Sequence, residues 1–403
     1  MRPALEVADI LRAHGEAYQA NHRVSAEQAA VMRHLVTCRT AALGGHVDAC
    51  DQCGFQRVSY NSCRDRHCPK CQAAKRAQWV EQRLARLLPV PYFHVVFTLP
   101  EPLKPLVLRN RRRVYELLFR AASATLLQLA ADPKRLGAQI GLTAVLHTWS
   151  QNLLFHPHLH CVVTGGGLTA DGDHWVAARE GYLLPVKVMA RLFRGKFLHG
   201  LQQLYETGEL SFAGSTESLN HPRAFAALRD QLYRQDWIVY AKPPFGGAEH
   251  VYRYLGRYTH RVAIANSRLI AMEGDRVRFH WKDYAHGNQI RQMTLSAEEF
   301  IRRFLLHVLP KRFVRIRHYG LMAGRNVDTR LARCRALLES AAEPSSTPSP
   351  SAALTLPGDE KDWKTCPRCR GALRRRELPA GHAMLRLASA SVLARPVETL
   401  DSS

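Results

Sequence analysis

The segment His156-Pro-His-Leu-His160 runs on through Cys161-Val-Val-Thr164 and stops at Gly165-Gly-Gly167. A short apolar run that ends at glycines predicts a buried β-strand. Because side chains alternate along a strand, His156, His158 and His160 should share one face and could present their imidazoles to a single metal ion. The alternative is that each histidine is buried and satisfied by a backbone carbonyl.

Apolar segments on either side of this strand predict further strands. They run from Tyr92 to Leu99, from Ile140 to Trp149 and from Asp236 to Lys242, and helical spacing fills the stretch from about Leu103 to Ala131. This order predicts an α+β fold with helices packed on one side of a sheet.

The other segments carry weaker or more local patterns. Residues 168 to about 220 predict an insertion with a small hairpin and helices. Residues 262–270 and 276–284 predict a hairpin around Glu273-Gly-Asp275, and residues 298–307 predict a helix.

Two tyrosines occur four residues apart in Tyr254-Leu-Gly-Arg-Tyr258. Helical spacing resumes at Ala248, after the break at Pro243-Pro-Phe-Gly-Gly247, so both phenols should point from the same face of a helix. Tyrosines at this spacing can also serve packing alone. Cations recur at the same spacing and could either neutralise phosphates or form a solvated face; they are Arg253, Arg257 and Arg261.

Six of the ten cysteines fall between positions 38 and 71. Cys50-Asp-Gln-Cys53 and Cys68-Pro-Lys-Cys71 have the spacing of two zinc knuckles and predict one four-cysteine zinc site. A disulfide framework is the alternative, but nothing in the sequence marks an exported protein.

A second zinc site could form in the same region. Its candidate ligands are Cys38, His46, Cys63 and His67. Farther along, Cys366-Pro-Arg-Cys369 supplies half of such a site, and we interpret it as a degenerate or truncated knuckle.

The chain has 57 Lys and Arg residues against 34 Asp and Glu residues, a formal charge of +23. This excess is spread along the sequence and favours a polyanionic partner, nucleic acid above all. We expect no membrane association, because no apolar run approaches 20 residues and no signal peptide is apparent.

The stretch from Lys311 to Tyr319 interleaves cations with aromatic residues, which suits DNA backbone contact and base stacking, although a solvated amphipathic strand is the alternative. Its candidate DNA-binding residues are Lys311, Arg312, Arg315 and Arg317.

Together these motifs resemble the two-tyrosine HUH transposases, the rolling-circle family typified by insertion sequence ninety-one. The resemblance covers roughly residues 30 to 325. It rests on ordered motifs: Cys50 to Cys71, Phe93-His-Val-Val-Phe-Thr-Leu-Pro100, His156 to His160, Tyr254-Leu-Gly-Arg-Tyr-Thr-His-Arg261 and Leu309-Pro-Lys-Arg-Phe-Val-Arg-Ile-Arg317. It implies an HUH nuclease core, built on a central antiparallel sheet with helices packed on it and preceded by a small helical and zinc-knuckle domain.

The resemblance also implies a chemistry. His158 and His160 match the HUH pair, which would hold a catalytic Mg²⁺ or Mn²⁺, and Tyr254 and Tyr258 match the paired nucleophiles. Attack by a tyrosine would leave a 5′-phosphotyrosine and a free 3′-OH on single-stranded DNA or on hairpin element ends. The third metal ligand is open: His156 is our first choice because it shares the strand face, and Glu249 and His260 are alternatives.

We therefore expect five parts: a helical lead-in (1–37), a zinc-binding domain with a basic helix (38–88), the catalytic domain with its insertion (89–325), a disordered linker (339–358) and a poorly specified tail (359–403). The expected location is the bacterial cytoplasm, at the nucleoid. Two other functions remain open at this point. One is a non-catalytic, zinc-dependent DNA-binding protein, and the other is a replication initiator or relaxase with the same HUH chemistry.

Overall fold

In the computed structural model of the chain, the histidine strand lies inside a six-stranded antiparallel sheet. The structure describes residues 5–242, 250, 256, 263–284, 286–340 and 364–381. Five strands follow the order β11-β4-β5-β3-β7, and β6 pairs with the end of β5. The strands are β3 (Tyr92–Thr98), β4 (Gln139–Trp149), β5 (Phe155–Leu168), β6 (Trp175–Ala177), β7 (Val239–Lys242) and β11 (Ile316–Gly320). The three strands predicted beside the histidine strand are therefore confirmed as β3, β4 and β7, although β7 begins at Val239 and not at Asp236. The expected stop at Gly165 is wrong, because β5 continues through the glycines to Leu168 and pairs there with β6.

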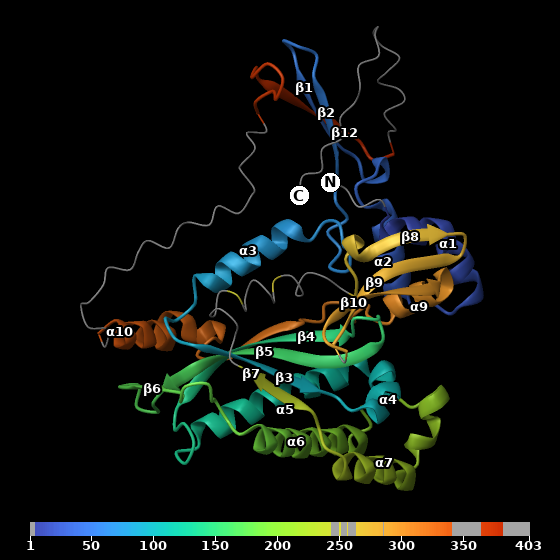
Figure 1. Cartoon of the computed structure of the whole chain (residues 1–403). Coiled ribbons are helices and arrows are strands. Elements are labelled where there is room, and N and C mark those ends of the chain that lie inside the picture. Colours follow the sequence, from blue (N-terminus) through green and yellow to red (C-terminus); the bar gives the residue numbers. More distant parts are fainter. Residues whose placement is uncertain are drawn as a thin grey trace.

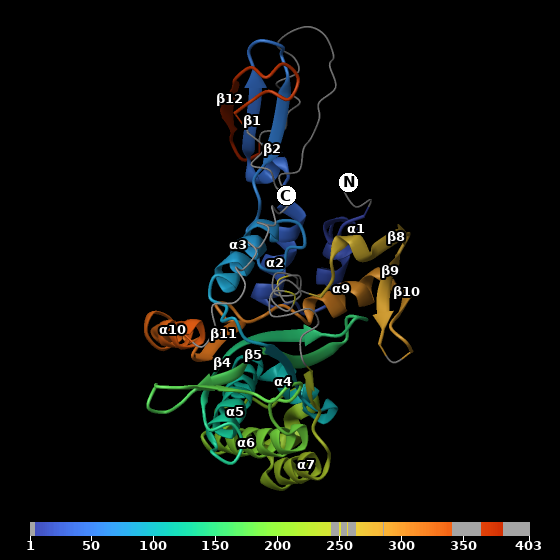
Figure 2. The same cartoon turned by 60° about the vertical axis from the view of Figure 1, so that its left-hand side comes forward.

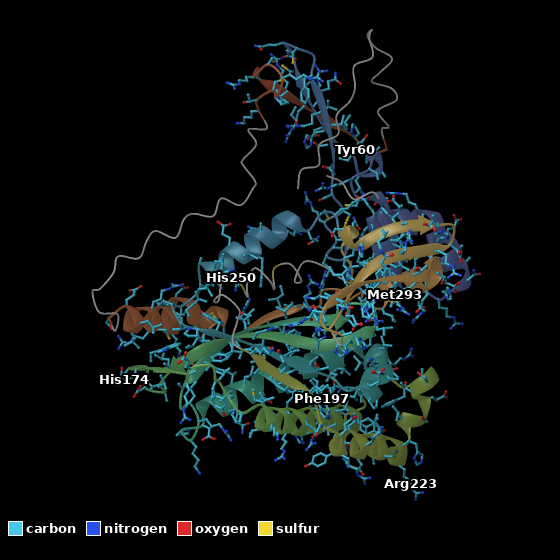
Figure 3. All side chains as sticks on the ribbon, in the orientation of Figure 1. Tyr60, His174, Phe197, Arg223, His250 and Met293 are labelled. Carbon is cyan, nitrogen blue, oxygen red and sulfur yellow. The ribbon has the colours of Figure 1, made fainter. Side chains whose placement is uncertain are left out.

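Because side chains alternate along each strand, the two faces of this sheet pack against different residues. On one face, Leu159, Cys161 and Val163 of β5 join the largest apolar core. The helices on that face lie below the sheet in Figure 1; they are α4 (Lys104–Arg109), α5 (Arg111–Ala131), α6 (Val186–Glu206) and α7 (Pro222–Arg234). Phe197 of α6, labelled in Figure 3, is fully buried in that core. The expected α+β fold is confirmed, but the expectation that helices lie on only one side of the sheet is wrong, because α3 (Ala73–Leu84) and α10 (Ala332–Ser340) pack on the other face.

The opposite face carries the histidines and a smaller apolar cluster. Val145 and Val162 lie on this face, where they pack with Leu88 and, from α10, Cys334. The covering helices are α3 (Ala73–Leu84) and α10 (Ala332–Ser340), so the basic helix expected to reach about residue 88 ends earlier. The segment 168–220 contains the expected hairpin strand β6 and helix α6, but α6 is part of the main core.

A second layer joins the N-terminal helices to a later three-stranded sheet. This sheet has the order β10-β9-β8, and the hairpin predicted around Glu273-Gly-Asp275 forms its β8–β9 turn. One buried cluster connects these strands with three helices, so residues 7–37 are an integral part of this layer. The elements are α1 (Val7–Asn21), α2 (Ala26–Thr37), α9 (Ala297–Leu305), β8 (Leu269–Glu273), β9 (Arg276–Asp283) and β10 (Gln289–Ser296).

A narrow three-stranded ribbon stands apart from both layers, at one end of the molecule (Figure 2). It consists of β1 (Gly45–Cys50), β2 (Gln56–Tyr60) and β12 (Leu373–Leu378). The tail predicted over 359–403 is therefore wrong for residues 364–381, because β12 pairs with β1 over six residues. The predicted linker lies outside the described residues except for Glu339 and Ser340, which belong to α10.

Short helical turns complete the described chain: η1 (Ala41–Leu43), η2 (Glu101–Leu103), η3 (Gly214–Asn220), η4 (Asn266–Arg268), η5 (Gly324–Asn326) and the π-helical turn η6 (Val327–Leu331). None of the helices in the described ranges combines the length and the apolar character needed to cross a bilayer.

Candidate active site

Three histidines from two neighbouring strands converge on the α3 side of the six-stranded sheet. His158 and His160 come from β5, and His147 of β4 is the register partner of His158. Their candidate ligand nitrogens all lie within 4.8 Å of one another. The Nε2 atoms of His158 and His160 are 3.0 Å apart, a separation that suits two imidazoles binding the same ion.

The third member of this cluster differs from our expectation. His156 stands beside His158, with ring centroids 5.1 Å apart, but it is not among the three residues whose nitrogens converge. His147 therefore replaces His156 as the candidate third ligand. A sequence signal existed, because His147 lies within a predicted strand, but only the register between β4 and β5 brings it to the site.

Hydrogen bonds orient two of these rings. His158 Nδ1 donates to the backbone carbonyl of His156 at 2.6 Å, which leaves Nε2 of His158 facing His160. The other nitrogen of His160, Nδ1, lies 2.8 Å from Nε2 of His94 on β3. Partners of this kind fix the tautomer and the ring orientation of a metal-binding histidine.

Burial also keeps the cluster uncharged. It lowers the pKa of His158 to about 3, with a further contribution from His156. Burial first, and then neighbouring histidines, hold the pKa values of His147 and His160 well below the ordinary value. All three imidazoles are thus neutral at pH 7, which is the form that binds a metal ion.

A cavity of about 390 Å³ opens onto the histidine cluster. Part of its wall comes from β9 and the residues after it, where Trp281, Lys282 and Tyr284 line it. Tyr284 is 56% exposed, and the Lys282 ammonium lies 5.3 Å from its ring centroid. Aromatic faces and a cation beside a candidate metal site suit a nucleic acid strand whose bases can stack.

The predicted nucleophiles lie outside the described residues. This applies to Tyr254 and Tyr258, to the three cations of the same segment (Arg253, Arg257 and Arg261), and to the alternative ligands Glu249 and His260. His250 and Gly256 of this segment are described, and both are helical. Figure 3 shows His250 on the α3 side of the sheet, which is also the side of the histidine cluster.

The basic stretch from Lys311 to Tyr319 divides into exposed and buried cations. Lys311 and Arg312 are exposed. Arg315 is only 7% exposed, and burial, followed by the nearby Arg66, lowers its pKa to about 9. The expectation that Arg315 contacts DNA is therefore corrected, because its side chain is inside the protein.

Arg317, expected to contact DNA, instead packs on the protein. Its guanidinium lies over two rings of the protein itself, 4.5 Å from the centroid of Phe119 and 5.2 Å from that of Phe313. The aromatic residues of this stretch thus pack inward, and β11 pairs with β4. Of the four cations predicted here, Lys311 and Arg312 keep the exposure that DNA contact needs.

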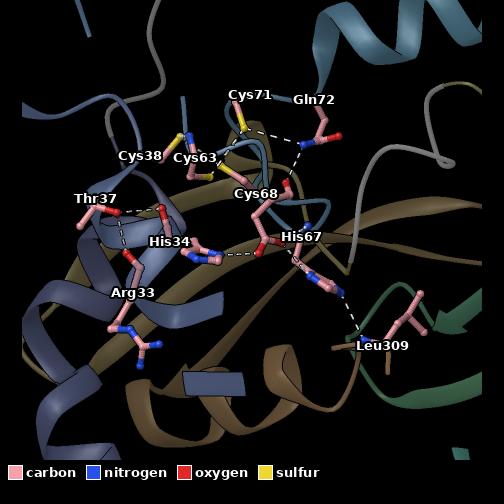
Figure 4. Close-up of polar contacts among 11 residues, drawn as sticks. Arg33, His34, Thr37, Cys38, Cys63, His67, Cys68, Cys71, Gln72 and Leu309 are labelled. Carbon is pink, nitrogen blue, oxygen red and sulfur yellow. Dashed lines mark hydrogen bonds and ion pairs between the residues drawn. The ribbon is translucent and has the colours of Figure 1, made fainter. Parts of the chain in front are cut away.

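The cysteines group differently from the predicted single site. Cys38, Cys63, Cys68 and Cys71 form one group with all sulfur atoms within 4.8 Å of one another (Figure 4). The Sγ atoms of Cys38 and Cys68 are 3.5 Å apart, and those of Cys63 and Cys71 are 3.7 Å apart. The predicted pairing of Cys50 and Cys53 with Cys68 and Cys71 is therefore wrong.

Neither histidine proposed for the second zinc site belongs to this group. His67 instead binds Asp65 through Nδ1 at 2.8 Å, and its Nε2 accepts a hydrogen bond from the Leu309 N–H. His46 lies on β1, 3.9 Å from Asp48. The first cysteine cluster is thus made of four sulfur ligands, all from the segment 38–71.

Hydrogen bonds among the four thiols of this cluster shift their pKa values in opposite directions. Hydrogen bonds from the neighbouring thiols, with that of Cys38 first, hold the pKa of Cys71 well below its ordinary value. The interaction with Cys38 raises the pKa values of Cys63 and Cys68. Four thiolates repel one another unless a cation lies between them, so this donor set fits Zn²⁺.

The carboxylate of Asp65, which is 12% exposed, holds the loop that carries these cysteines. Burial alone would raise the pKa of Asp65, but hydrogen bonds from His67 and His34 outweigh burial and leave it well below the ordinary value. The backbone carbonyl of Asp65 accepts a hydrogen bond of 2.6 Å from Gln72. These contacts tie the loop to α2 and to the start of α3 (Figure 4).

The remaining C-x2-C pair of the ribbon has an unexpected partner. Cys50 and Cys53 form a second group with Cys366 and Cys369, again with all four sulfur atoms within 4.8 Å. Our interpretation of Cys366 and Cys369 as a degenerate half-site is therefore wrong. Spacing along the sequence could not have revealed this pairing, because 313 residues separate Cys53 from Cys366.

Comparisons with known proteins agree with this arrangement. A family model described as "Putative transposase" matches residues 141–330, and one described as "Transposase zinc-binding domain" matches residues 10–99. The first range contains the histidine cluster. The second contains the first cysteine cluster together with Cys50 and Cys53.

Two curated proteins are similar over most of their length. The "Putative transposase y4qJ" of Sinorhizobium fredii is 55% identical over 351 residues, which cover 87% of this chain and 88% of that protein. The "Transposase for insertion sequence element IS801" of Pseudomonas savastanoi pv. phaseolicola is 29% identical over 326 residues, or 79% of this chain and 75% of that protein. No solved structure matches the chain.

Proposed function

Because this chain belongs to the transposase family typified by insertion sequence ninety-one, we propose that it nicks and rejoins single-stranded DNA through 5′-phosphotyrosine intermediates. The observation that carries this proposal is the neutral cluster of His147, His158 and His160 beside a cavity walled by aromatic residues. The substrate would be a single strand or a hairpin at the ends of the element. The reaction would take place in the bacterial cytoplasm, at the nucleoid.

The histidine cluster fits a divalent cation. Imidazole nitrogens suit first-row transition ions, whereas Mg²⁺ prefers oxygen ligands, so among Mg²⁺ and Mn²⁺ the donor set favours Mn²⁺. His147, His158 and His160 would hold the ion. When bound, it would withdraw charge from the scissile phosphate and ease the ionisation of a nearby phenol.

Tyr254 and Tyr258 would supply the nucleophiles. A phenol has an ordinary pKa near 10, so it must lose its proton before it attacks. The phenolate oxygen would form a bond to phosphorus while the bond from phosphorus to the 3′-oxygen breaks. That oxygen takes up a proton to become the free 3′-OH, and the 5′-phosphate stays on the tyrosine. Two tyrosines allow two strands to be held in succession.

Several cations would steer the DNA. Lys282 lines the cavity, and Arg253, Arg257 and Arg261 recur along the tyrosine segment. Each can neutralise a backbone phosphate, which makes binding dependent on salt. Lys311 and Arg312 offer further exposed charge.

The test is an adduct assay with a labelled single-stranded oligonucleotide and Mn²⁺. The parent protein should give a protein–DNA adduct that survives denaturation, and the variant with both Tyr254→Phe and Tyr258→Phe should give none. Tyr233→Phe is the matched control, because Tyr233 is 59% exposed on α7 and should not affect the adduct. Mass spectrometry of the adduct would identify the tyrosine that attacks.

Three results would reject the proposal. An adduct that persists in the double phenylalanine variant would exclude these nucleophiles. DNA binding without any adduct in the parent would favour a non-catalytic, zinc-dependent DNA-binding protein. Adducts formed at a plasmid origin, but not at element ends, would instead identify a replication initiator or relaxase.

A further inference from the structure

We propose that Cys50, Cys53, Cys366 and Cys369 form a second zinc site, which fastens a segment near the end of the chain onto the N-terminal ribbon. The Sγ atoms of Cys50 and Cys369 are 3.4 Å apart, and those of Cys53 and Cys366 are 3.5 Å apart. Four sulfurs at about 2.3 Å from one zinc ion in a tetrahedron lie about 3.8 Å from each other. A disulfide would instead require about 2.05 Å.

The two cysteine loops have the same backbone structure. In the first, the Cys50 N–H donates to the Phe55 carbonyl at 2.8 Å, and the Gly54 N–H donates to the Cys50 carbonyl at 3.0 Å. In the second, the Cys366 N–H donates to the Gly371 carbonyl at 2.8 Å, and the Arg370 N–H donates to the Cys366 carbonyl at 2.9 Å. Each loop thus makes the same two hydrogen bonds at the same offsets from its first cysteine.

The backbone dihedral angles agree as well. The residue after the second cysteine has a positive φ in both loops, 69° at Gly54 and 61° at Arg370. A side chain at such a φ is uncommon, because the left-handed region costs roughly 1 kcal/mol or more for most residues. The hydrogen bonds of the second loop hold Arg370 in this left-handed conformation and bring the thiols of Cys366 and Cys369 together. A loop that had lost its zinc-binding role would not need this conformation.

Strand pairing holds the second loop against the first. β12 pairs with β1 without a register shift, from Gly45 opposite Leu378 to Cys50 opposite Leu373. In the middle of this pairing the carboxylate of Asp48, only 1% exposed, binds Arg375 of β12 at 2.7 Å and Arg57 of β2 at 2.9 Å. These contacts place the segment 364–381 in the ribbon independently of the cysteines.

The ribbon is too small to be held by apolar burial alone. Its buried cluster contains Cys50, Phe55, Cys366 and Leu373, and two of these four residues are candidate ligands. Domains with so little core usually need a metal or disulfides, and the binding energy of a structural zinc ion contributes directly to folding. The second zinc site would therefore be a condition for the ribbon to form.

This site draws on parts of the chain that lie far apart. Cys50 and Cys53 fall within the range matched by the zinc-binding family model, whereas Cys366 and Cys369 fall outside both matched ranges. The zinc-binding region would thus be completed by residues after the catalytic domain. Because the site lies in the ribbon, it does not depend on the phosphotyrosine chemistry proposed above.

The experiment is a zinc count by native mass spectrometry on the full-length chain. We expect two zinc ions per chain in the parent and one in the variant with both Cys366→Ala and Cys369→Ala. The variant with both Cys50→Ala and Cys53→Ala, which removes the two N-terminal ligands of the same site, should also hold one zinc ion. Cys161→Ala is the matched control, since Cys161 is a buried cysteine of the main core, and it should keep both ions.

A second measurement needs no variant. Cys369 is exposed, so a free thiol there should react readily with iodoacetamide. We expect Cys369 to be protected in the zinc-loaded parent and to react after chelation. One zinc ion per chain in the parent, rapid alkylation of Cys369 while zinc is bound, or a disulfide that includes Cys366 or Cys369 would each overturn the proposal.

Discussion

His307 offers a sharp test of how burial controls charge in this protein. Its ring is 1% exposed and lies between the two main layers. Nε2 donates to the Leu153 carbonyl at 3.0 Å, and Nδ1 faces the Thr148 hydroxyl at 3.3 Å. We consider the substitution His307→Gln, which removes the titrating group and can keep one of these hydrogen bonds.

The size of the effect follows from the pKa difference. Burial is the main cause that lowers the pKa of His307 from 6.5 to about 3 in the folded protein. Between pH 6.5 and pH 3, His307 therefore binds a proton in the unfolded chain but not in the folded chain. The stability that the neutral ring contributes is complete above pH 6.5 and falls as the pH drops toward 3. At pH 5 this proton lowers the unfolding free energy by about 2 kcal/mol, since each pH unit between the two pKa values counts for about 1.4 kcal/mol.

The assay is urea unfolding of parent and variant, followed by tryptophan fluorescence at pH 7.5 and pH 5.0. At pH 7.5 the variant should be less stable by roughly 1–3 kcal/mol, because it loses the ring and one hydrogen bond. At pH 5.0 the difference in unfolding free energy between parent and variant should be smaller by about 2 kcal/mol, because only the parent loses stability when His307 is protonated in the unfolded chain. Other titrating groups are common to both proteins and cancel.

The control for this comparison is His174→Gln. His174 is exposed in the loop before β6, at the edge of the molecule (Figure 3), so its substitution removes no buried ring and should change the unfolding free energy by less than about 0.5 kcal/mol. A gap for His307→Gln that is equal at pH 7.5 and pH 5.0 would refute the reasoning, since it would mean that His307 titrates alike in the folded and unfolded chains.

Three other predictions concern the metal site, the ribbon and the core. His147→Ala should reduce Mn²⁺-dependent adduct formation by at least about 10–100-fold, the loss that is usual even for a residue that only orients a metal ligand, whereas His156→Ala should change it by only a few-fold. The reverse order would restore His156 as the third ligand. Asp48→Ala should leave Arg57 and Arg375 without their carboxylate. Because Arg375 remains partly exposed to water, the loss should cost the ribbon roughly 1–3 kcal/mol, seen as faster amide hydrogen exchange in residues 373–378 with unchanged exchange in β4 and β5. Phe313→Ala removes a ring packed against Tyr115 and Phe119 and should lower the unfolding free energy by about 3–5 kcal/mol; a loss below 1 kcal/mol in urea unfolding would contradict its assignment to the core.

Local patterns in the sequence were sufficient for most of the central sheet. Apolar runs predicted β3 and β4 to within one residue at each end, because such boundaries are set by nearby residues. β5 is longer than the expected run from Leu159 to Thr164, because its glycines pair with β4 and β6 instead of ending the strand. Alternation along β5 likewise put His158 and His160 on one face. These features depend on the backbone of one segment, which the sequence of that segment largely determines.

Pairings between distant segments could not be read in the same way. His147 reaches the metal cluster through the register of β4 with β5, and a shift of one residue would turn it to the opposite face. Several C-x2-C pairs in one chain have identical local chemistry, so spacing cannot say which two share an ion. The pairing of β1 with β12, together with Asp48 and Arg375, decides it for the ribbon.

The charge around the histidine cluster predicts how metal and DNA should bind together. Among the described residues, the cavity is lined by histidines, aromatic, apolar and uncharged polar side chains and one lysine, with no carboxylate. A divalent cation there would gain ligand bonds from neutral nitrogens but no compensation of its charge, in a chain that already carries +23. A DNA phosphate would supply the missing negative charge.

Mn²⁺ should therefore bind more tightly when a single-stranded oligonucleotide is present. By thermodynamic linkage, the oligonucleotide should bind more tightly in the presence of Mn²⁺, by the same factor. Titration calorimetry on the variant with both Tyr254→Phe and Tyr258→Phe, which cannot form an adduct, would measure both affinities; equal Mn²⁺ affinity with and without DNA would mean that the cation's charge is balanced within the protein itself.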